Sequence, residues 1–350
     1  MEWLFRVGVV FLLSAGVSKT TVADDAAAVK SLKASATSLK FDDKGLLAEA
    51  NFRGTKIGDA ELAPLAHLTN LRAVLLNDTN ISDVGLATLG RIKTLVNLDL
   101  RGCKISNAGM AHLAGLNGLR GLRFNGKSGR TTVDDEGLKH LEKLTSLKVL
   151  ALDFLWVSEE GLAKLTSLKR VEELYLAKTL VGDEAMAVLK QFPRLRKLRV
   201  AQTQVSSKGL EHVSKLPALE ALDVSETGLI FDEGLAHVGK MAALKKLNLW
   251  RVVVTDDGIA HLSGLHKLQW LNVDNTQLTD AGLAHLKAMK QLAFLHLGST
   301  AVTDAGLPHL ESLTALKDLK VTRTGVTASG VALLQKKLPK TAIQLKYIEQ

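Results

Sequence analysis

The sequence predicts an α/β solenoid in which parallel strands line a concave face and short helices cover the convex face. The 350-residue chain repeats with a period of 24 residues, which is typical of a solenoid. Each repeat joins a strand pattern to a helix pattern, and neither can bury its apolar face alone. The twelve units begin at residues 47, 71, 95, 119, 147, 171, 195, 219, 244, 268, 292 and 316.

The first half of each unit reads LxxLxL and predicts a short strand. In the tenth unit Leu271 and Val273 alternate along the chain, so both side chains face one side of the strand, towards the core. The third, fifth, seventh and eighth residues of each unit then face the concave surface.

The second half of each unit predicts a short helix. Thr279-Asp280 and Thr303-Asp304 open this half, and these residue types favour the N-cap and the first helical turn. Leu283 and Leu286 follow at a spacing of three, which gives one apolar stripe.

Threonine recurs at the ninth position of eight units, where a short polar side chain can hydrogen-bond the backbone of the turn after the strand. These residues are Thr55, Thr79, Thr179, Thr203, Thr227, Thr276, Thr300 and Thr324. Cys103 is the single cysteine and takes this slot in the third unit. We therefore expect a small buried residue there rather than a nucleophile, and one cysteine excludes an intramolecular disulfide.

The common pattern LxxLxLxxTxhTDxGLxxLxxLxx resembles the leucine-rich-repeat family, and most nearly its bacterial 24-residue form with TDxGL helices, which is related to the repeats of F-box and ribonuclease-inhibitor-like proteins. The resemblance covers residues 47–340. It implies a right-handed solenoid that supplies a binding surface rather than one chemistry. Some relatives carry an F-box before the repeats, but residues 24–46 are too few for that domain.

The first 23 residues have the layout of a secretory signal peptide. Arg6 precedes the apolar run Val7–Ala15, and the small residues before Asp24 end in Ala23. The apolar run is shorter than the roughly 20 residues of a membrane span, so no membrane span is expected after removal of the signal. The sequence thus predicts export, to the periplasm, the cell surface or the medium.

Both ends of the array are predicted to be capped. Residues 24–46 form the N-terminal cap, with Ala26, Val29 and Leu32 on one helical face and a possible strand over residues 37–41. Residues 341–350 form the C-terminal cap strand, in which Ile343, Leu345 and Tyr347 alternate. Such caps cover the core that an array exposes at its ends.

The formal net charge of +9 suggests an anionic partner only if the basic residues gather on one face. Basic and acidic residues instead occur in similar numbers at the predicted concave positions. A nucleic-acid groove would concentrate one sign, so no nucleic-acid binding is expected.

Aromatic residues make up only 4% of the chain, and their placement singles out units nine to eleven. The candidate partner-binding residues there are Trp250, Arg251, Trp270, Asn272, Asp274, Phe294 and His296, and a smaller patch holds Tyr175 and Arg199. Trp270 and Phe294 share a column on neighbouring strands. An aromatic patch ringed by polar groups suits a protein or a glycan partner, and an aromatic pair that packs only on itself is the alternative.

The sequence offers no convincing catalytic, cofactor or metal site. Seven histidines occupy one slot on the predicted convex face and form a row, whereas metal ligands must converge on one point. His296, Asp274 and Ser299 could be drawn as a triad, but no GxSxG motif accompanies them. The sequence therefore predicts a non-catalytic protein that binds a protein partner through its concave surface. An envelope glycan-binding module and a structural spacer are the alternatives.

Overall fold

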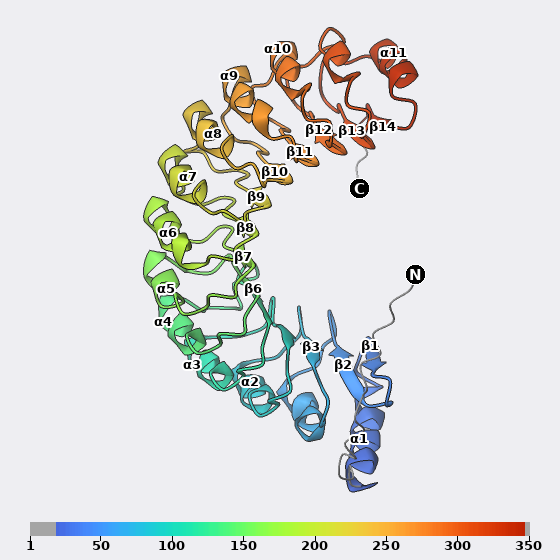
Figure 1. The fold of residues 1–350 in the computed structure, drawn as a ribbon. Coiled ribbons are helices and arrows are strands. Elements are labelled where there is room, and N and C mark those ends of the chain that lie inside the picture. The colour runs from blue at the N-terminus through green and yellow to red at the C-terminus, as the bar shows by residue number, and fades with distance from the viewer. Residues whose placement is uncertain (1–18, 347–350) are drawn as a thin grey trace, which may run out of the picture.

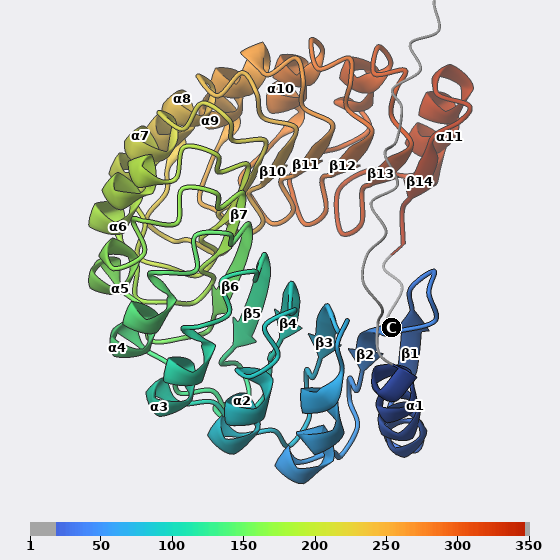
Figure 2. The same ribbon diagram turned by 60° about the horizontal axis from the view of Figure 1, so that its bottom comes forward.

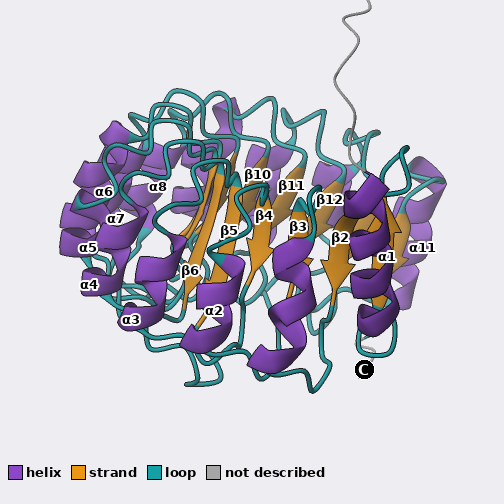
Figure 3. Cartoon of the chain, turned by 90° about the horizontal axis from the view of Figure 1, so that it is seen from below, coloured by secondary structure: helices purple, strands orange, loops and turns teal. Residues whose placement is uncertain are grey.

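The computed structural model describes residues 19–346. The chain forms an open arc with its strands on the inner side and its helices on the outer side (Figure 1, Figure 2). Viewed from below, the strands lie inside the arc of helices, with α2 and α3 in front of them (Figure 3). The predicted solenoid, with its sheet on the concave face, is therefore confirmed.

The strands of the described part make one sheet in sequence order. They are β1 (Ser38–Phe41), β2 (Leu47–Asn51), β3 (Ala73–Leu75), β4 (Asn97–Asp99), β5 (Gly121–Asn125), β6 (Val149–Asp153), β7 (Glu173–Tyr175), β8 (Lys197–Arg199), β9 (Ala221–Asp223), β10 (Lys246–Asn248), β11 (Trp270–Asn272), β12 (Phe294–His296), β13 (Asp318–Lys320) and β14 (Ala342–Gln344). Each predicted unit contributes one strand, from β2 to β13.

The outer layer consists of short helices, most of them one or two turns long. The α-helices are α1 (Lys19–Leu32), α2 (Asp83–Leu89), α3 (Asn107–Met110), α4 (Asp135–Leu138), α5 (Glu159–Ala163), α6 (Asp183–Val188), α7 (Ser207–Val213), α8 (Asp232–Val238), α9 (Asp256–Ala260), α10 (Asp280–Leu283) and α11 (Ala328–Lys337). The 3-10 helices are η1 (Asp59–His67), η2 (Ala111–Leu113), η3 (Lys139–Leu141), η4 (Leu189–Gln191), η5 (His261–Gly264), η6 (Ala284–Leu286) and η7 (Leu307–Leu310).

The strand register reproduces the 24-residue period. Leu247 pairs with Leu271, and Leu271 pairs with Leu295, in parallel ladders. The first, fourth and sixth residues of the units point inward, and one continuous apolar core runs along the arc. Since each strand contacts mainly its neighbours, the core grows by one layer per unit.

The ends of the array differ from the units between them. β1 pairs antiparallel with β2, whereas the other strand pairs of the described residues are parallel. In α1 Leu32 is buried and Val29 packs against the core, but Ala26 is exposed and Ala28 takes the predicted inward place. At the other end β14 adds one more parallel strand. Ile343 and Leu345 pack on the core, and Tyr347 lies outside the described residues.

Aspartates tie each helix to the next one along the array. Asp280 Oδ1 accepts a hydrogen bond of 2.7 Å from the Thr303 backbone N–H, and Asp280 Oδ2 accepts one of 2.6 Å from the Thr303 hydroxyl. Thr303 Oγ1 in turn accepts a bond from the Ala305 N–H. The same pair of bonds is made within residues 19–346 by Asp59, Asp83, Asp135, Asp183, Asp232, Asp256, Asp280 and Asp304. We call these contacts the aspartate links.

The aspartate links are altered at three places. Asn107 exchanges two hydrogen bonds with Asp134 in place of an aspartate link. Ser207 accepts one bond, from the Phe231 N–H. Glu159 replaces the aspartate of unit five, and the facing residue Gly182 has no side-chain hydroxyl; within the described chain no hydrogen bond joins the two residues.

The glycine of TDxGL leaves room for the aspartate link. A Cβ atom at Gly109 would overlap Asp83 Oδ1 and lie 2.7 Å from its Cγ. Gly330 meets Asp304 in the same way. The motif therefore combines a helix cap, a carboxylate that reaches the next cap, and a glycine that lets the carboxylate pass.

In eleven of the twelve units the eighth residue, in the turn after the strand, has positive φ; in unit four, with its inserted loop, Gly129 has positive φ instead. Excluding glycine, these residues have φ between 51° and 63° within residues 19–346: Asp78, Phe154, Lys178, Gln202, Glu226, Arg251, Asn275, Ser299 and Arg323. The left-handed conformation is unfavourable for most of these residue types, and aspartate and asparagine tolerate it best. Backbone bonds to the next unit hold it in place, such as the one from Arg251 N to Asp274 O at 3.0 Å.

Seven of the eight ninth-position threonines close this turn as predicted, whereas the Thr227 hydroxyl lies 3.3 Å from Val200 O and 3.4 Å from Ser225 O. Thr276 Oγ1 donates to Val273 O at 2.8 Å, and Thr300 Oγ1 donates to Leu297 O at 2.6 Å. Cys103 is fully buried in the same slot, and its Sγ lies 3.2 Å from Leu76 O. Burial raises the pKa of the Cys103 thiol to about 11. A protonated, inaccessible thiol fits the structural role expected for this residue.

The first prediction concerns the aspartate links. Asp280→Ala should lower the free energy of unfolding by about 1–3 kcal/mol, because the Thr303 N–H and hydroxyl lose their acceptor. Asp257→Ala is the matched control, since Asp257 also lies in a first helical turn but its carboxylate makes no hydrogen bond within the described residues. Urea unfolding of both variants measures the difference, and equal losses would contradict a role for the link.

The second prediction concerns the glycine. Gly109→Ala should destabilise the protein by about 1–3 kcal/mol, because the new methyl group overlaps Asp83. The loss should be clearly smaller in an Asp83→Ala background, where the overlapping atoms are gone. Gly264→Ala is the control, because a Cβ atom there meets nothing within 4 Å. The idea fails if the Gly109→Ala penalty is the same in both backgrounds.

Candidate partner-binding face

Three neighbouring strands present the centre of the candidate face. β10, β11 and β12 pair in parallel, with Trp270 directly beside Phe294 and Asn272 beside His296. The leucines between these residues point into the core, so these side chains project from the concave side. The sequence predicted this column correctly, since it follows from the 24-residue register.

Trp270 and Phe294 stack on each other. Their ring centroids lie 4.9 Å apart and the ring planes differ by 6°. Lys320 Nζ lies 5.7 Å from the Phe294 centroid, and the His296 ring meets Phe294 edge-on at 6.4 Å. Both stacked residues are half-buried, so the pair packs on itself and still presents part of its surface.

Trp250 lies apart from this stack. It follows β10, and its ring is covered by the Arg251 guanidinium at 5.6 Å. Arg251 Nη1 also lies 3.2 Å from Glu226 Oε2. In the described part of the chain no ring contact joins Trp250 to Trp270 or Phe294, so the three aromatic residues do not form one continuous platform.

His296 and Asp274 lie together beside the stack. His296 Nε2 is 3.9 Å from Asp274 Oδ2. Burial lowers the pKa of His296 below its ordinary value and outweighs the opposing effect of Asp274, so the ring is neutral at pH 7. Among residues 19–346 no hydrogen bond connects Ser299 with His296, so the triad is not assembled.

Several predicted site residues have bonds within the protein. The side-chain oxygen of Asn272 accepts a bond of 3.0 Å from the Asp274 N–H. The Tyr175 hydroxyl donates to Glu173 Oε2 at 2.7 Å, and burial followed by the hydrogen bond to Glu173 raises the tyrosine pKa. Arg199 lies between Asp153 and Asp223, at 3.2 and 3.3 Å. These contacts fix the orientation of the side chains on the concave face.

An open hollow joins the two predicted patches. It has a volume of about 380 Å³ and is lined by Tyr175, Lys197, Leu198, Arg199, Ala221, Leu222, Asp223, Lys246, Asn248 and Trp270. The small patch of Tyr175 and Arg199 and the larger patch with Trp270 are therefore ends of one surface. The candidate site residues chosen from the sequence did not include Lys197 or Lys246, which were counted only as basic concave residues, or Ala221. One alanine between two lysines in the same column was the available signal.

Charges along the rest of the concave face pair across strands. Asp99 is 1% exposed and lies between Arg53 and Arg101. Burial alone would raise the pKa of Asp99, but the bond and charge of Arg101 outweigh it and hold the pKa below its usual value. This alternation of signs differs from the one-signed groove of a nucleic-acid site.

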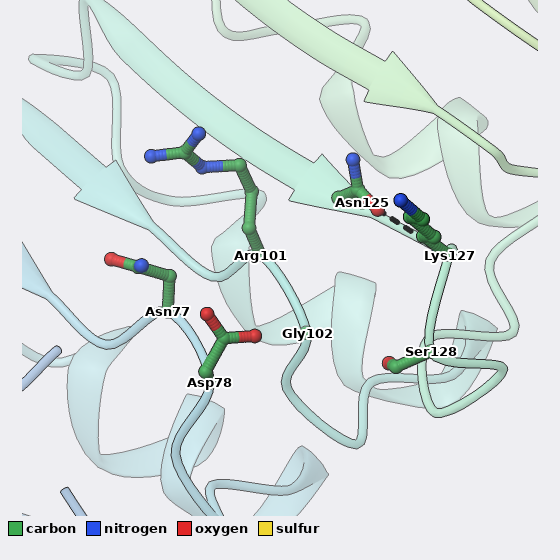
Figure 4. A pocket seen from close by; sticks show the side chains of 7 residues that line it. All are labelled: Asn77, Asp78, Arg101, Gly102, Asn125, Lys127 and Ser128. Atoms are coloured by element: carbon green, nitrogen blue, oxygen red, sulfur yellow. Dashed lines mark hydrogen bonds between the residues drawn. The ribbon is translucent and has the colours of Figure 1, made fainter. Parts of the chain in front are cut away.

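A second, more polar hollow lies beside the loop inserted in unit four (Figure 4). It measures about 330 Å³ and is lined by Asn77, Asp78, Arg101, Gly102, Asn125, Lys127 and Ser128. The Asp78 carboxylate and the Ser128 hydroxyl point towards it from opposite sides (Figure 4). Arg130 holds the loop back against unit two, with its Nη2 at 2.7 Å from Thr79 O.

Within residues 19–346 no cluster of histidine, cysteine, aspartate or glutamate is arranged to hold a metal ion. The convex histidines remain a row. In the same part of the chain no helix is both long enough and apolar enough to cross a membrane.

Comparison with known proteins places the repeats in a family. A family model described as "Leucine Rich repeat" matches residues 92–114. An internalin of Listeria monocytogenes is similar in structure, with 21% identity, 87% of each chain covered and a TM-score of 0.63. At this identity the likeness shows the fold alone. No curated protein sequence matches the chain.

Two further solved structures are more distant. A leucine-rich-repeat protein of Leptospira interrogans has 18% identity over 81% of this chain and 80% of its own, with a TM-score of 0.48. A plant peptide hormone receptor, solved in complex with RGF2, has 15% identity over 89% of this chain and 60% of its own, with a TM-score of 0.45. The 24-residue strand register, the family match at residues 92–114 and the fold shared with the internalin identify the chain as a solenoid of leucine-rich repeats.

Proposed function

We propose that this protein is exported and binds a protein partner through its concave face, with the centre of the site on β10, β11 and β12. The stacked pair Trp270 and Phe294 is the observation that carries the proposal. Large aromatic residues that are rigid and partly exposed tend to dominate the affinity of protein interfaces. Stacking reduces the freedom of both rings before a partner arrives, which lowers the entropy lost on binding.

The surroundings of the stack support the same proposal. Ion pairs such as Arg199 with Asp223 hold polar side chains in place across the sheet. Parallel strands then offer many fixed side chains to one partner, with aromatic residues in the middle and polar residues around them. This arrangement corresponds to the apolar core and polar rim of protein interfaces.

A glycan-binding role and a spacer role are the alternatives. Sugar binding would use free aromatic faces, but Phe294 is flanked by Trp270 and Lys320, and the Trp250 ring is covered by Arg251. One open face of Trp270 remains, which is less stacking surface than a continuous aromatic platform would offer a sugar. This favours a protein partner that uses this face together with the ring edges. A spacer would be indifferent to the identity of these residues.

Export rests on the N-terminal sequence. The proposed signal peptide covers residues 1–23, of which residues 1–18 lie outside the described residues. Cleavage after Ala23 would cut α1, which begins at Lys19. The mature helix would then begin at Asp24 and keep Leu32, whose side chain is buried.

The third prediction tests the concave face. A variant with Trp250→Ala, Trp270→Ala and Phe294→Ala should bind its protein partner at least about tenfold more weakly, because the aromatic anchors are lost. Partners are captured from cell-envelope and medium extracts by the exported protein, identified, and then titrated against both forms. Circular dichroism confirms that the variant is folded.

The matched control removes exposed apolar side chains elsewhere, by Val84→Ala, Trp156→Ala and Leu333→Ala. These residues are 68%, 68% and 65% exposed and should leave partner binding unchanged. Competition by soluble glycans would support the glycan alternative. A purified partner that binds the aromatic variant as tightly as the parent would refute the proposal.

The fourth prediction tests export. Expression of the full chain should give a mature protein whose first residue is Asp24, because the small residues before it suit signal peptidase. N-terminal sequencing and intact mass of the protein in cell fractions measure this. Ala23→Arg should block processing, and an unprocessed parent protein confined to the cytoplasm would contradict export.

A further inference from the structure

The hollow beside Trp270 lies over Ala221, a small residue with larger neighbours on both sides in its column. Lys197, Ala221, Lys246 and Trp270 lie side by side at the third position of four successive units. The Ala221 methyl group fills little of the space between its lysine neighbours. Leu198 and Leu222 contribute apolar surface beneath it.

The charges around the hollow are unequal. Lys197 Nζ lies 2.7 Å from Glu173 Oε1. Asp223, the acidic residue of the lining, is engaged by Arg199 and by the Ser225 hydroxyl. Lys246 is exposed, and within residues 19–346 it takes part in no ion pair. The hollow therefore combines an apolar floor, an aromatic wall and one uncompensated cation.

We propose that this hollow receives an apolar side chain of the protein partner, and that a carboxylate next to that side chain pairs with Lys246. The inference rests on the proposed function, because the hollow is part of the same concave face. An apolar group alone would leave the lysine without a counter-charge. A small inorganic anion would gain nothing from Ala221, the leucines or Trp270, since burial of apolar surface supplies the larger part of such binding.

The chemistry of the occupant follows from these contacts. An aliphatic or aromatic side chain fills the space above Ala221 and lies against the free side of Trp270. The carboxylate comes from a neighbouring aspartate or glutamate, or from a chain terminus, and is steered by the cation. Glu173 and Asp223 already have partners, so they do not neutralise Lys246 in the free protein.

N-acetyl-phenylalanine is a suitable probe, and its methyl ester is the uncharged control. Saturation-transfer NMR on the exported protein should show saturable binding of the acid and weaker binding of the ester. Lys246→Ala should weaken binding of the acid by at least about threefold and leave the ester unaffected. Ala221→Phe should weaken binding of both compounds by at least about tenfold, because the hollow is filled.

Two control variants match these substitutions. Lys178→Ala removes an exposed lysine from the same side of the sheet, outside the lining. Ala342→Phe enlarges a residue of the same column at the end of the array. Neither should alter binding of the acid. Absence of saturable binding up to about 10 mM, or binding that ignores both Lys246→Ala and Ala221→Phe, would overturn the inference.

The captured protein partner separates this inference from the proposed function. Phe294 is not part of the lining but stacks on Trp270, so Phe294→Ala should weaken binding of the partner clearly more than binding of the small acid. If the triple aromatic variant no longer binds the partner but Ala221→Phe and Lys246→Ala bind it with unchanged affinity, the inference is wrong and the proposed function stands. If all of these variants keep the partner, both are wrong.

Discussion

The aspartate links are the interaction on which the rest of the fold depends. Most helices in the described array are only one or two turns long, too short to be stable alone in water. A carboxylate that accepts hydrogen bonds from both the backbone N–H and the hydroxyl of the N-cap residue in the next unit fixes the distance and the rotation between neighbouring helices. Asp280 and Thr303 illustrate this with bonds of 2.7 and 2.6 Å. The leucine layers then meet in register, and the strands on the inner face follow.

The 24-residue register also determines which side chains are neighbours on the concave face. Residues 24 positions apart become neighbours, which brings Trp270 against Phe294 and places Ala221 between two lysines. Most charged groups on the face find partners within the protein, so little of its charge is free for a ligand. The exceptions, such as Lys246 beside an apolar hollow, therefore carry more information about recognition than the net charge of the chain does.

The solenoid, its register and the stacked pair could be predicted from the sequence, because they follow directly from periodicity. The aspartate link could not be predicted. Aspartate is already expected in the first turn of a helix, so its presence gives no sign that its carboxylate also bonds the N-cap of the next unit. Ala26 was assigned to the inner face of the first helix, whereas Ala28 lies there; spacing alone did not separate the two. The eighth position gave no signal, because arginine, lysine, glutamate and phenylalanine all occupy it.

The candidate site shows the same limit. Trp250 shares the concave side with the stacked pair but lies under Arg251, and that contact depends on a left-handed turn that the sequence does not reveal. The hollow was missed because it arises from a side chain that is small. Patterns of large apolar residues predict which positions form the core, but they do not predict where a small side chain leaves a cavity on the surface.

The missing link between Glu159 and Gly182 has a mechanical consequence. Units five and six share the core and a strand ladder, but their helices lack the aspartate link that fixes the rotation between neighbouring helices elsewhere. In a one-dimensional array each contact holds only its own neighbours. We therefore expect the curvature of the arc to change most easily at this junction, between units one to five and units six to twelve. Such a change would alter the width of the concave face without unfolding any unit.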